Sequence, residues 1–424
     1  MSTTTTAVAE EEAPRVPAPV PRELGTALSD YFARVRGGDV GSLPAILGLL
    51  VLFIVFSILR PNTFTNSFNL ANLVNQSAAV MVIAMGLVFV LLLGEIDLAA
   101  GWTAGTAAAM MGIAVTRHSW PWWLAVLVCL LTGTLIGTLI GLLVARLGIA
   151  SFVVTLAAFL ALQGVLLKTI GEGGTIAIRD SKLLAINNNT MPVWLGWVLW
   201  AVIVGLYAAI TLQRAAARRA GGLQSEGFSL ILAKIVTIAL LLGAVTAYLS
   251  RERSRNPAVS SIKGVPEVVL LLVILLVGLN FVLSRTAFGR HVYAVGGNAE
   301  AARRSGINVK QIMLFCFMIG STLAAVGGIL LASRDNSISP STGGAETLLY
   351  AVGAAVIGGT SLFGGKGKIL DAVLGGLVIA VIINGMGLLN QPSSVVYMIT
   401  GLVLLIAASV DALSRRRAAS TGRV

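Results

Sequence analysis

The sequence predicts an all-α, polytopic membrane protein with about twelve transmembrane helices, within a range of roughly 10–14. Apolar residues make up 56% of the 424-residue chain and charged residues only 11%, whereas about a quarter of a soluble domain is charged. A soluble protein of this length could not hide so much apolar surface, because its own surface needs polar residues. The 47 glycines are typical of close helix packing in lipid. This composition excludes a soluble enzyme, a disordered protein and a disulfide-stabilised secreted domain.

The chain divides into three expected parts. Residues 1–42 are rich in Thr, Ala, Pro and Glu and contain no apolar core, so we expect a disordered cytoplasmic tail rather than a cleavable signal peptide. Residues 43–413 form the expected membrane domain, and residues 414–424 a basic cytoplasmic tail.

Each expected span is an apolar run close to the roughly 20 residues that cross a bilayer as a helix. The third run is short, which favours a half-helix or re-entrant segment. In the fourth run Gly133, Gly137 and Gly141 repeat every four residues, which indicates a face that packs closely against another helix. The twelve runs are 43–59, 73–94, 102–116, 121–144, 151–170, 192–212, 230–249, 266–284, 312–333, 346–363, 370–388 and 393–413.

The distribution of charge predicts that both termini lie in the cytoplasm. The net charge is +12, and with the N-terminus inside, 20 of the 30 Lys and Arg residues fall on the cytoplasmic side and 10 outside. This bias follows the positive-inside rule, so we attribute the basic excess to membrane topology and expect no nucleic-acid partner. Arg251, Arg253 and Arg255 are the exception, because this topology places them outside. They mark either a surface for an acidic partner or a miscounted span.

Residues 94–102 interrupt the apolar pattern after the second span. Glu95 and Asp97 lie between Gly94 and Gly101, and carboxylates in a membrane are costly unless they face a cavity, a protein partner or the interface. The glycines permit an unwound break with exposed carbonyls, and carboxylates there would suit a polyhydroxyl ligand. The alternative is a tight interfacial turn with solvated acids.

Residues 358–369 form a second glycine-rich break, after the tenth span. The expected topology puts both breaks on one side, and such breaks in the two halves of a transporter can mark its transport site or gate. The second break is not a phosphate-binding loop, because Gly-Lys-Ser/Thr is absent. Asn75 and Gln76, near the start of the second span, are suited either to line a polar path or to cap that helix. The predicted pathway residues are Asn75, Gln76, Glu95, Asp97, Thr360 and Ser361.

Residues 285–311 form the longest predicted cytoplasmic connection. Asn298 is suited to cap a short helix, Glu300 favours its positive N-terminus, and Gly306 can end it in a left-handed conformation. A small Ala face would fit a groove while Arg303 and Arg304 reach outward, as in a helix that docks a cytoplasmic protein. The alternative is an interfacial helix that rests on lipid headgroups.

Residue sets typical of enzymes do not occur in the sequence. There is no Ser-His-Asp set, nucleophile elbow or acidic metal motif. We therefore expect no catalytic residue, metal or cofactor. A membrane-bound transferase would need an acidic or histidine cluster in a sizeable loop, so that class is disfavoured.

The chain resembles the permeases of sugar ABC importers of the ribose/xylose type, which are related to the branched-chain amino-acid permeases. The resemblance extends over roughly residues 45–415, and the order of the motifs is kept. Glu95 before Ile96-Asp97-Leu98 is similar to the xylose branch. The sequence departs from the family pattern at Ala99, Ala100, Trp102 and Ala150. The motifs are FGRHVYAVGGNAEAARRSGINV (288–309), GEIDLAAG (94–101), SFVVTL (151–156), VIGGTSL (356–362), GLQS (222–225) and GVP (264–266).

The resemblance implies a membrane-spanning permease subunit, without an ATPase site of its own, that imports a monosaccharide, xylose or a related sugar, across the bacterial inner membrane. It implies a homodimer, two cytoplasmic ATPase subunits, and a periplasmic or lipid-anchored sugar-binding protein. The remaining alternative is an ion-coupled secondary transporter of a small polar solute, although such a protein would carry charged pairs deep within several spans. The residues expected to couple to the ATPase are Asn298, Glu300, Ala301, Ala302, Arg303 and Gly306.

Overall fold

The computed structural model describes residues 41–223, 227–254, 256–258 and 261–420. The predicted N-terminal tail therefore lies, up to residue 40, outside the described residues, as do Arg255 and residues 421–424 of the predicted C-terminal tail. Two short strands, β1 (Ile176–Ala177) and β2 (Ser337–Ile338), pair antiparallel. The helices of the described chain are α2 Leu43–Leu59, α3 Ser67–Leu92, α4 Ala100–Thr116, α5 Trp122–Ala145, α6 Ser151–Ile170, α7 Ser181–Asn188, α8 Val193–Ala220, α9 Phe228–Leu249, α10 Val268–Arg285, α11 Ala287–Gly297, α12 Ala299–Arg304, α13 Val309–Asp335, α14 Ala345–Gly358, α15 Ile369–Leu388 and α16 Ser393–Ser420.

The predicted all-α membrane architecture is confirmed. Each of the twelve predicted spans coincides with a helix, and nine helices of the described residues are long and apolar enough to cross a membrane. The shorter apolar helices are α2 and α14, and α4 has 17 residues and begins at Ala100. The helix α14 ends at Gly358 rather than at residue 363, because Gly359 adopts a left-handed conformation with φ of +119°.

The chain forms two compact units. One contains residues 198–244, which make up most of α8 and α9, together with residues 1–33, which the structure does not describe. Within this unit the Trp200 indole donates a 3.0 Å hydrogen bond to the Ala239 carbonyl. The larger unit contains the rest of the chain, and every site discussed below belongs to it.

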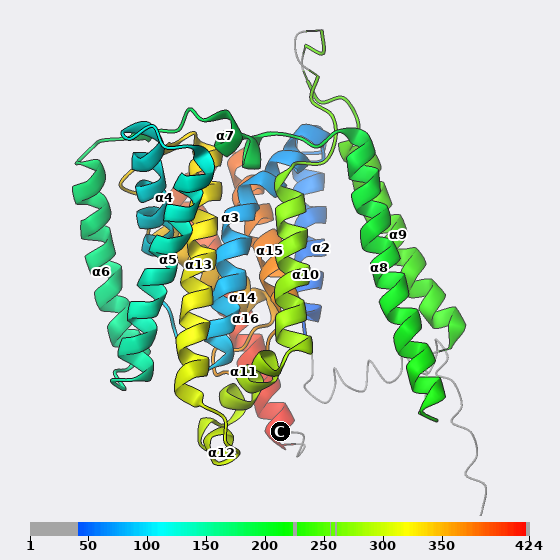
Figure 1. The fold of residues 1–424 in the computed structure, drawn as a ribbon. Helices are drawn as coiled ribbons and strands as arrows, with labels where there is room; N and C mark the ends of the chain where they lie inside the picture. Colours follow the sequence, from blue (N-terminus) through cyan, green and yellow to red (C-terminus); the bar gives the residue numbers. More distant parts are fainter. Residues whose placement is uncertain (1–40, 224–226, 255, 259–260, 421–424) are drawn as a thin grey trace, which may run out of the picture. The chain divides into compact units, whose positions relative to one another are not determined.

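Helices α3 and α13 lie at the centre of the larger unit (Figure 1). Most of α3 is buried, as expected of a helix that is apolar on all sides. Asn66 caps its start by accepting a 2.9 Å hydrogen bond from the Phe68 amide. Helix α13 also packs against α5. A Cβ on Gly137 of α5 would lie 2.6 Å from the Phe317 backbone oxygen of α13. Gly133 and Gly141 make similar contacts with α13, which confirms the predicted close-packing face.

A pair of asparagines joins α3 to α15. The Asn69 amide nitrogen donates to the Asn384 side-chain oxygen at 2.8 Å, and the Asn384 nitrogen donates back to Asn69 at 3.0 Å. Both side chains are buried. Each amide therefore satisfies the other where water could not.

The helices α4 and α14 are too short to cross a bilayer of about 30 Å alone, and they begin next to each other. A Cβ on Gly101 would overlap the Gly343 carbonyl oxygen and lie 2.7 Å from that of Gly344. Two helix N-termini thus meet inside the unit, an arrangement typical of discontinuous transporter helices.

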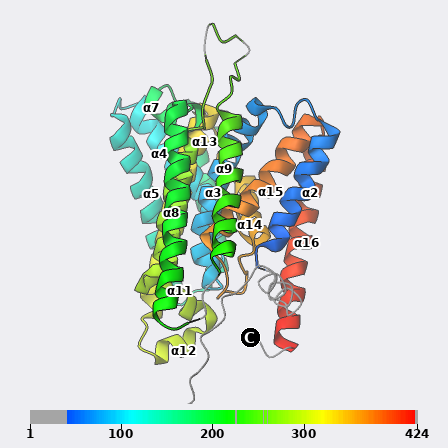
Figure 2. The same ribbon diagram turned by 90° about the vertical axis from the view of Figure 1, so that its right-hand side faces the viewer.

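The larger unit has two distinct ends. The helix α12 lies at one end and α7 at the other, and α2 begins and α16 ends at the α12 end (Figures 1 and 2). The two ends are called the α12 end and the α7 end below.

Candidate functional site

The helix α12 is a short, exposed element with a defined start and stop. The Asn298 side chain accepts a 2.9 Å hydrogen bond from the Ala301 amide, and Gly306 has a φ of +84°. These observations confirm the predicted cap and left-handed stop. Ala302 is buried, whereas Glu300 and Arg303 are exposed. The helix is therefore fixed by Ala302 on one side and open to a partner on the other.

The charged side chains of α12 pair with one another. Glu300 forms ion pairs with Arg303 at 2.9 Å and with Arg304 at 3.1 Å. The hydrogen bonds from Arg303 and Arg304 hold the pKa of the Glu300 carboxyl below its ordinary value. Because all three groups are exposed, the pairs add little stability. Their main effect is to order the three charged side chains on the exposed face of the helix.

The first break occupies residues 93–99, between α3 and α4. Gly94 has a φ of +77°, and the Asp97 carboxylate accepts a 2.9 Å hydrogen bond from the Ala99 amide at the start of α4. Asp97 is only 1% exposed, and Glu95 is half-buried. The Asp97 carboxylate thus lies at the positive end of α4, where the helix dipole stabilises it.

The α6 helix holds the first break in place. The Ser151 hydroxyl accepts a hydrogen bond from the Ile96 amide at 3.4 Å, and the Thr155 hydroxyl donates to the Ile96 carbonyl at 3.2 Å. Ser151 and Thr155 are not among the predicted site residues. Their position in the SFVVTL motif is the only sequence feature that points to them.

Asp371 organises the second break, residues 359–368. Its carboxylate accepts hydrogen bonds from the Lys368 amide at 2.7 Å, the Thr360 hydroxyl at 3.2 Å and the Ser42 hydroxyl at 3.3 Å. The side chain is 3% exposed. Ser361 accepts a 3.0 Å hydrogen bond from the Phe363 amide. Asp371 is a residue that the sequence-based site prediction missed.

The two breaks meet at the α12 end of α3. The Gly365 amide donates a 2.9 Å hydrogen bond to the Leu92 carbonyl, the last residue of α3. A Cβ on Gly94 would lie 3.4 Å from the Phe363 oxygen. The two glycine-rich segments that the sequence singles out are therefore direct neighbours.

Asn75 and Gln76 lie apart from the two breaks, toward the start of α3, and both are half-buried. The Asn75 carbonyl accepts a 3.2 Å hydrogen bond from the Asn187 side chain of α7, and the Asn187 amide donates to the Ser333 hydroxyl at 3.1 Å. A cluster of polar residues from α3, α7 and α13 thus forms at the α7 end.

Within the described residues, no cluster of three or more His, Cys, Asp or Glu side chains could hold a metal ion.

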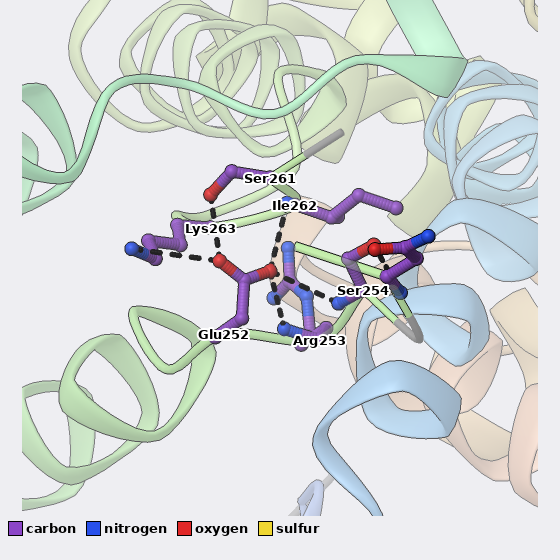
Figure 3. Close-up of polar contacts among 7 residues, drawn as sticks. Glu252, Arg253, Ser254, Ser261, Ile262 and Lys263 are labelled. Atoms are coloured by element: carbon purple, nitrogen blue, oxygen red, sulfur yellow. Dashed lines mark hydrogen bonds and ion pairs between the residues drawn. The ribbon is translucent and has the colours of Figure 1, made fainter. Parts of the chain in front are cut away.

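Arg251 and Arg253 of the predicted basic trio belong to a hairpin between α9 and α10, and Arg253 is shown in Figure 3. Arg253 is buried, and its guanidinium donates to the carbonyls of Leu249 at 2.8 Å and Gly264 at 2.7 Å. Arg251 lies over the Tyr248 ring at 5.2 Å. Arg253 therefore ties the two arms of the hairpin together, and it does not form part of an open basic surface.

Glu252 closes the same hairpin from the other side. Its carboxylate accepts hydrogen bonds from the Ser261 hydroxyl at 2.6 Å, the Ile262 amide at 2.9 Å and the Ser254 amide at 3.0 Å. Lys263 lies 3.5 Å away as an ion pair (Figure 3). The bond from Ser261, followed by those from the Ser254 and Ile262 amides, lowers the pKa of Glu252 to about 2.

Comparison with known proteins gives consistent similarities. Residues 69–408 match the family described as branched-chain amino acid transport system, permease component. The chain is similar to the xylose transport system permease protein XylH of Escherichia coli (strain K12), with 33% identity over 93% of this chain and 98% of the relative. It is 32% identical to XylH of Haemophilus influenzae, over 88% of this chain and 96% of the relative. The ribose import permease protein RbsC of Escherichia coli (strain K12) is 29% identical, over 87% and 92%. No solved structure was found to match.

Proposed function

This chain belongs to the family of branched-chain amino acid transport permease components, in its ribose/xylose group, and we propose that it imports xylose or a related monosaccharide. Membership of this family makes it the transmembrane subunit of an ABC transporter, without an ATPase domain. The observation that carries the proposal is the match to XylH along 93% of the chain. The family implies ATPase and binding-protein partners.

We propose that α12 is the element on which the ATPase subunits dock. Asn298 and Gly306 would set its two ends, Ala302 would seat it on the permease, and Glu300, Ala301 and Arg303 would meet the ATPase. In support, α12 is exposed except at Ala302. The other possible role is an interfacial helix on lipid headgroups, in which case ATPase binding would not depend on it.

We propose the orientation that follows from this assignment. If α12 faces the cytoplasm, both the start of α2 and the end of α16 do so as well, as the positive-inside rule favours. The α7 end would then face the periplasm of the bacterial inner membrane and receive the binding protein. The hairpin closed by Glu252 and Arg253 belongs to the connection between α9 and α10 on that side.

We propose that the working permease is a homodimer. Gln163 lies in the middle of α6 on a face that is open in the single chain, and a Cβ on its neighbour Gly164 would meet nothing within 4 Å. A polar side chain that faces lipid is unfavourable. A second copy, with the sugar path between the two, would cover this face.

The predicted pathway residues would act in two ways. Asn75, Gln76 and Glu95 are half-buried and are proposed to face the path. Asp97, Thr360 and Ser361 are each 1% exposed, and we propose that they form the wall by fixing the geometry of the two breaks.

The experiment is uptake of radiolabelled monosaccharides by proteoliposomes that contain the permease, its ATPase and its binding protein. We expect xylose or a related pentose to accumulate at least about ten-fold above ATP-free vesicles, since import against a gradient needs an energy source. Uptake without ATP that follows an imposed proton or sodium gradient would overturn the ABC assignment and favour an ion-coupled carrier. Uptake of another monosaccharide class would overturn only the xylose proposal.

A further inference from the structure

The helix α11, which precedes α12, is in close contact with the end of α3, just before the first break, and with the second break. A Cβ on Gly296 would overlap the Leu92 carbonyl oxygen and lie 2.9 Å from the Gly365 amide nitrogen. A Cβ on Gly364 would lie 2.8 Å from the Gly296 oxygen and 2.9 Å from the Gly94 nitrogen. The end of α11, the end of α3 and the second break therefore meet with backbone against backbone.

The close contact, and not an unusual backbone conformation, accounts for a glycine at position 296. It lies within α11 and is not among the glycines with positive φ. A glycine in a helix costs about 1 kcal/mol relative to alanine, so a glycine here needs another reason. The adjacent Gly297 provides the comparison, because a Cβ there would meet nothing within 4 Å.

A second link reinforces the contact. The Tyr293 hydroxyl, one turn earlier in α11, donates a 2.7 Å hydrogen bond to the Gly367 carbonyl. The Leu92 carbonyl accepts a 2.9 Å hydrogen bond from the Gly365 amide. Thus α11 is bound to the second break at two points, and the second break is bound to α3.

We infer that Gly296 and Tyr293 are the residues through which movement of α12 reaches the two breaks together. This inference rests on the proposed function, in which the ATPase moves α12. Asn298 alone separates α11 from α12, so a displacement of α12 also displaces the end of α11, which contains Gly296. Since packed backbones in contact do not deform continuously, α11, the end of α3 and the second break move as one body. Both breaks then change position in the same step.

The first test replaces Gly296 with alanine in the full complex. The added methyl group forces α11 away from Leu92 and Gly365, and overpacking of this kind is expected to lower ATP-driven uptake by about ten-fold or more. ATPase subunits should still copurify, and ATP hydrolysis should continue. The matched control, Gly297→Ala, should retain uptake within about two-fold of wild type, because its methyl group has open space. Wild-type-like uptake by Gly296→Ala would overturn the inference.

The second test measures the transmitted movement. The variant Leu93→Cys, at the residue just after α3, is labelled with a thiol reagent in the nucleotide-free and vanadate-trapped complexes; the native cysteines are buried. We expect the labelling rate to differ between the two states with Gly297→Ala and to be equal with Gly296→Ala. The same state dependence in both backgrounds would show that Gly296 serves only packing.

A milder variant keeps the test decisive if Gly296→Ala does not fold. Tyr293→Phe removes one hydrogen bond and should lower uptake several-fold while ATPase binding is unchanged. The control is Tyr397→Phe, which removes a hydroxyl bonded to Glu346 at 3.1 Å and should leave uptake unchanged. If the wild-type complex binds the ATPase but moves no sugar, the proposed function fails instead.

Discussion

At the scale of single residues, the hairpin between α9 and α10 depends on two side chains of opposite charge. Arg253 donates to a carbonyl on each arm, and Glu252 accepts from amides on each arm. A backbone group that is buried without a partner costs about 1–3 kcal/mol. These side-chain bonds add to two backbone hydrogen bonds between the arms, from the Arg253 amide to the Ile262 carbonyl at 3.0 Å and from the Gly264 amide to the Leu249 carbonyl at 3.1 Å.

We expect the hairpin to loosen in acid. Because the pKa of Glu252 is lowered to about 2, its stabilising effect is complete above the unfolded pKa of about 4.3 and is lost as the pH falls towards 2. Hydrogen exchange at the Ser254 and Ile262 amides, corrected for intrinsic rates, should show protection at pH 6 that is lost at pH 2. In Glu252→Gln the protection should no longer depend on pH. Equal protection of the wild-type hairpin at pH 6 and pH 2 would contradict this role.

The residues that could be predicted are those whose partners are close in sequence. Asn298 and Gly306 are typical of a helix start and a helix stop, and both act as predicted. Asp371 could not be found in this way, because Lys368 is not a usual cap residue and Ser42 is far along the chain. Arg253 was grouped with its basic neighbours, since charge alone does not tell whether a guanidinium is buried.

At the scale of elements, α12 is small enough for one charge reversal to test it. In Glu300→Lys, the residues at positions 300, 303 and 304 would all be cationic, in place of the two ion pairs. We expect uptake to fall by about ten-fold or more through loss of complementary charge, and the ATPase to copurify poorly. Membrane insertion and thermal stability should stay normal, because these pairs are exposed.

The control for this reversal is Glu172→Lys, an exposed carboxylate in the connection between α6 and β1. The ATPase should copurify with this variant as with wild type, because residue 172 lies outside α12. Normal uptake by Glu300→Lys would instead favour the interfacial alternative for α12.

The two breaks show how far an element can be predicted. Glycine and polar residues after apolar runs indicated breaks at 94–102 and 358–369, and the helices are interrupted at residues 93–99 and 359–368. That the breaks touch each other, and that α11 touches the end of α3 and the second break, could not be predicted. These contacts join segments far apart in sequence, and periodicity describes only local order.

At the scale of the whole molecule, apolar runs were sufficient to locate a helix at each of the twelve predicted spans, because lipid requires every span to satisfy its own backbone. They did not indicate the short helices α7 and α11. Apolar runs contain no information about contacts with a second copy of the chain. The open face of α6 with Gln163 is the feature that points to a second copy.

We therefore expect cysteines at position 163 to cross-link between copies. In membranes treated with a mild oxidant or a short bifunctional thiol reagent, Gln163→Cys should give a covalent dimer on non-reducing gels. Val51→Cys on α2, which is 57% exposed, should stay monomeric, and the buried native cysteines should not react. A dimer from Val51→Cys and none from Gln163→Cys would place the interface elsewhere.

The asparagine pair between α3 and α15 has a consequence for how the chain is made. Asn69 enters the bilayer early in synthesis, whereas Asn384, its reciprocal partner, is translated only after most of the protein has been inserted. Until then the Asn69 side chain has the bond that its amide nitrogen donates to the Phe64 carbonyl at 2.9 Å, but not the pair with Asn384. We expect a chain truncated before α15 to be less stable at the start of α3, because Asn69 then lacks its partner across the bundle.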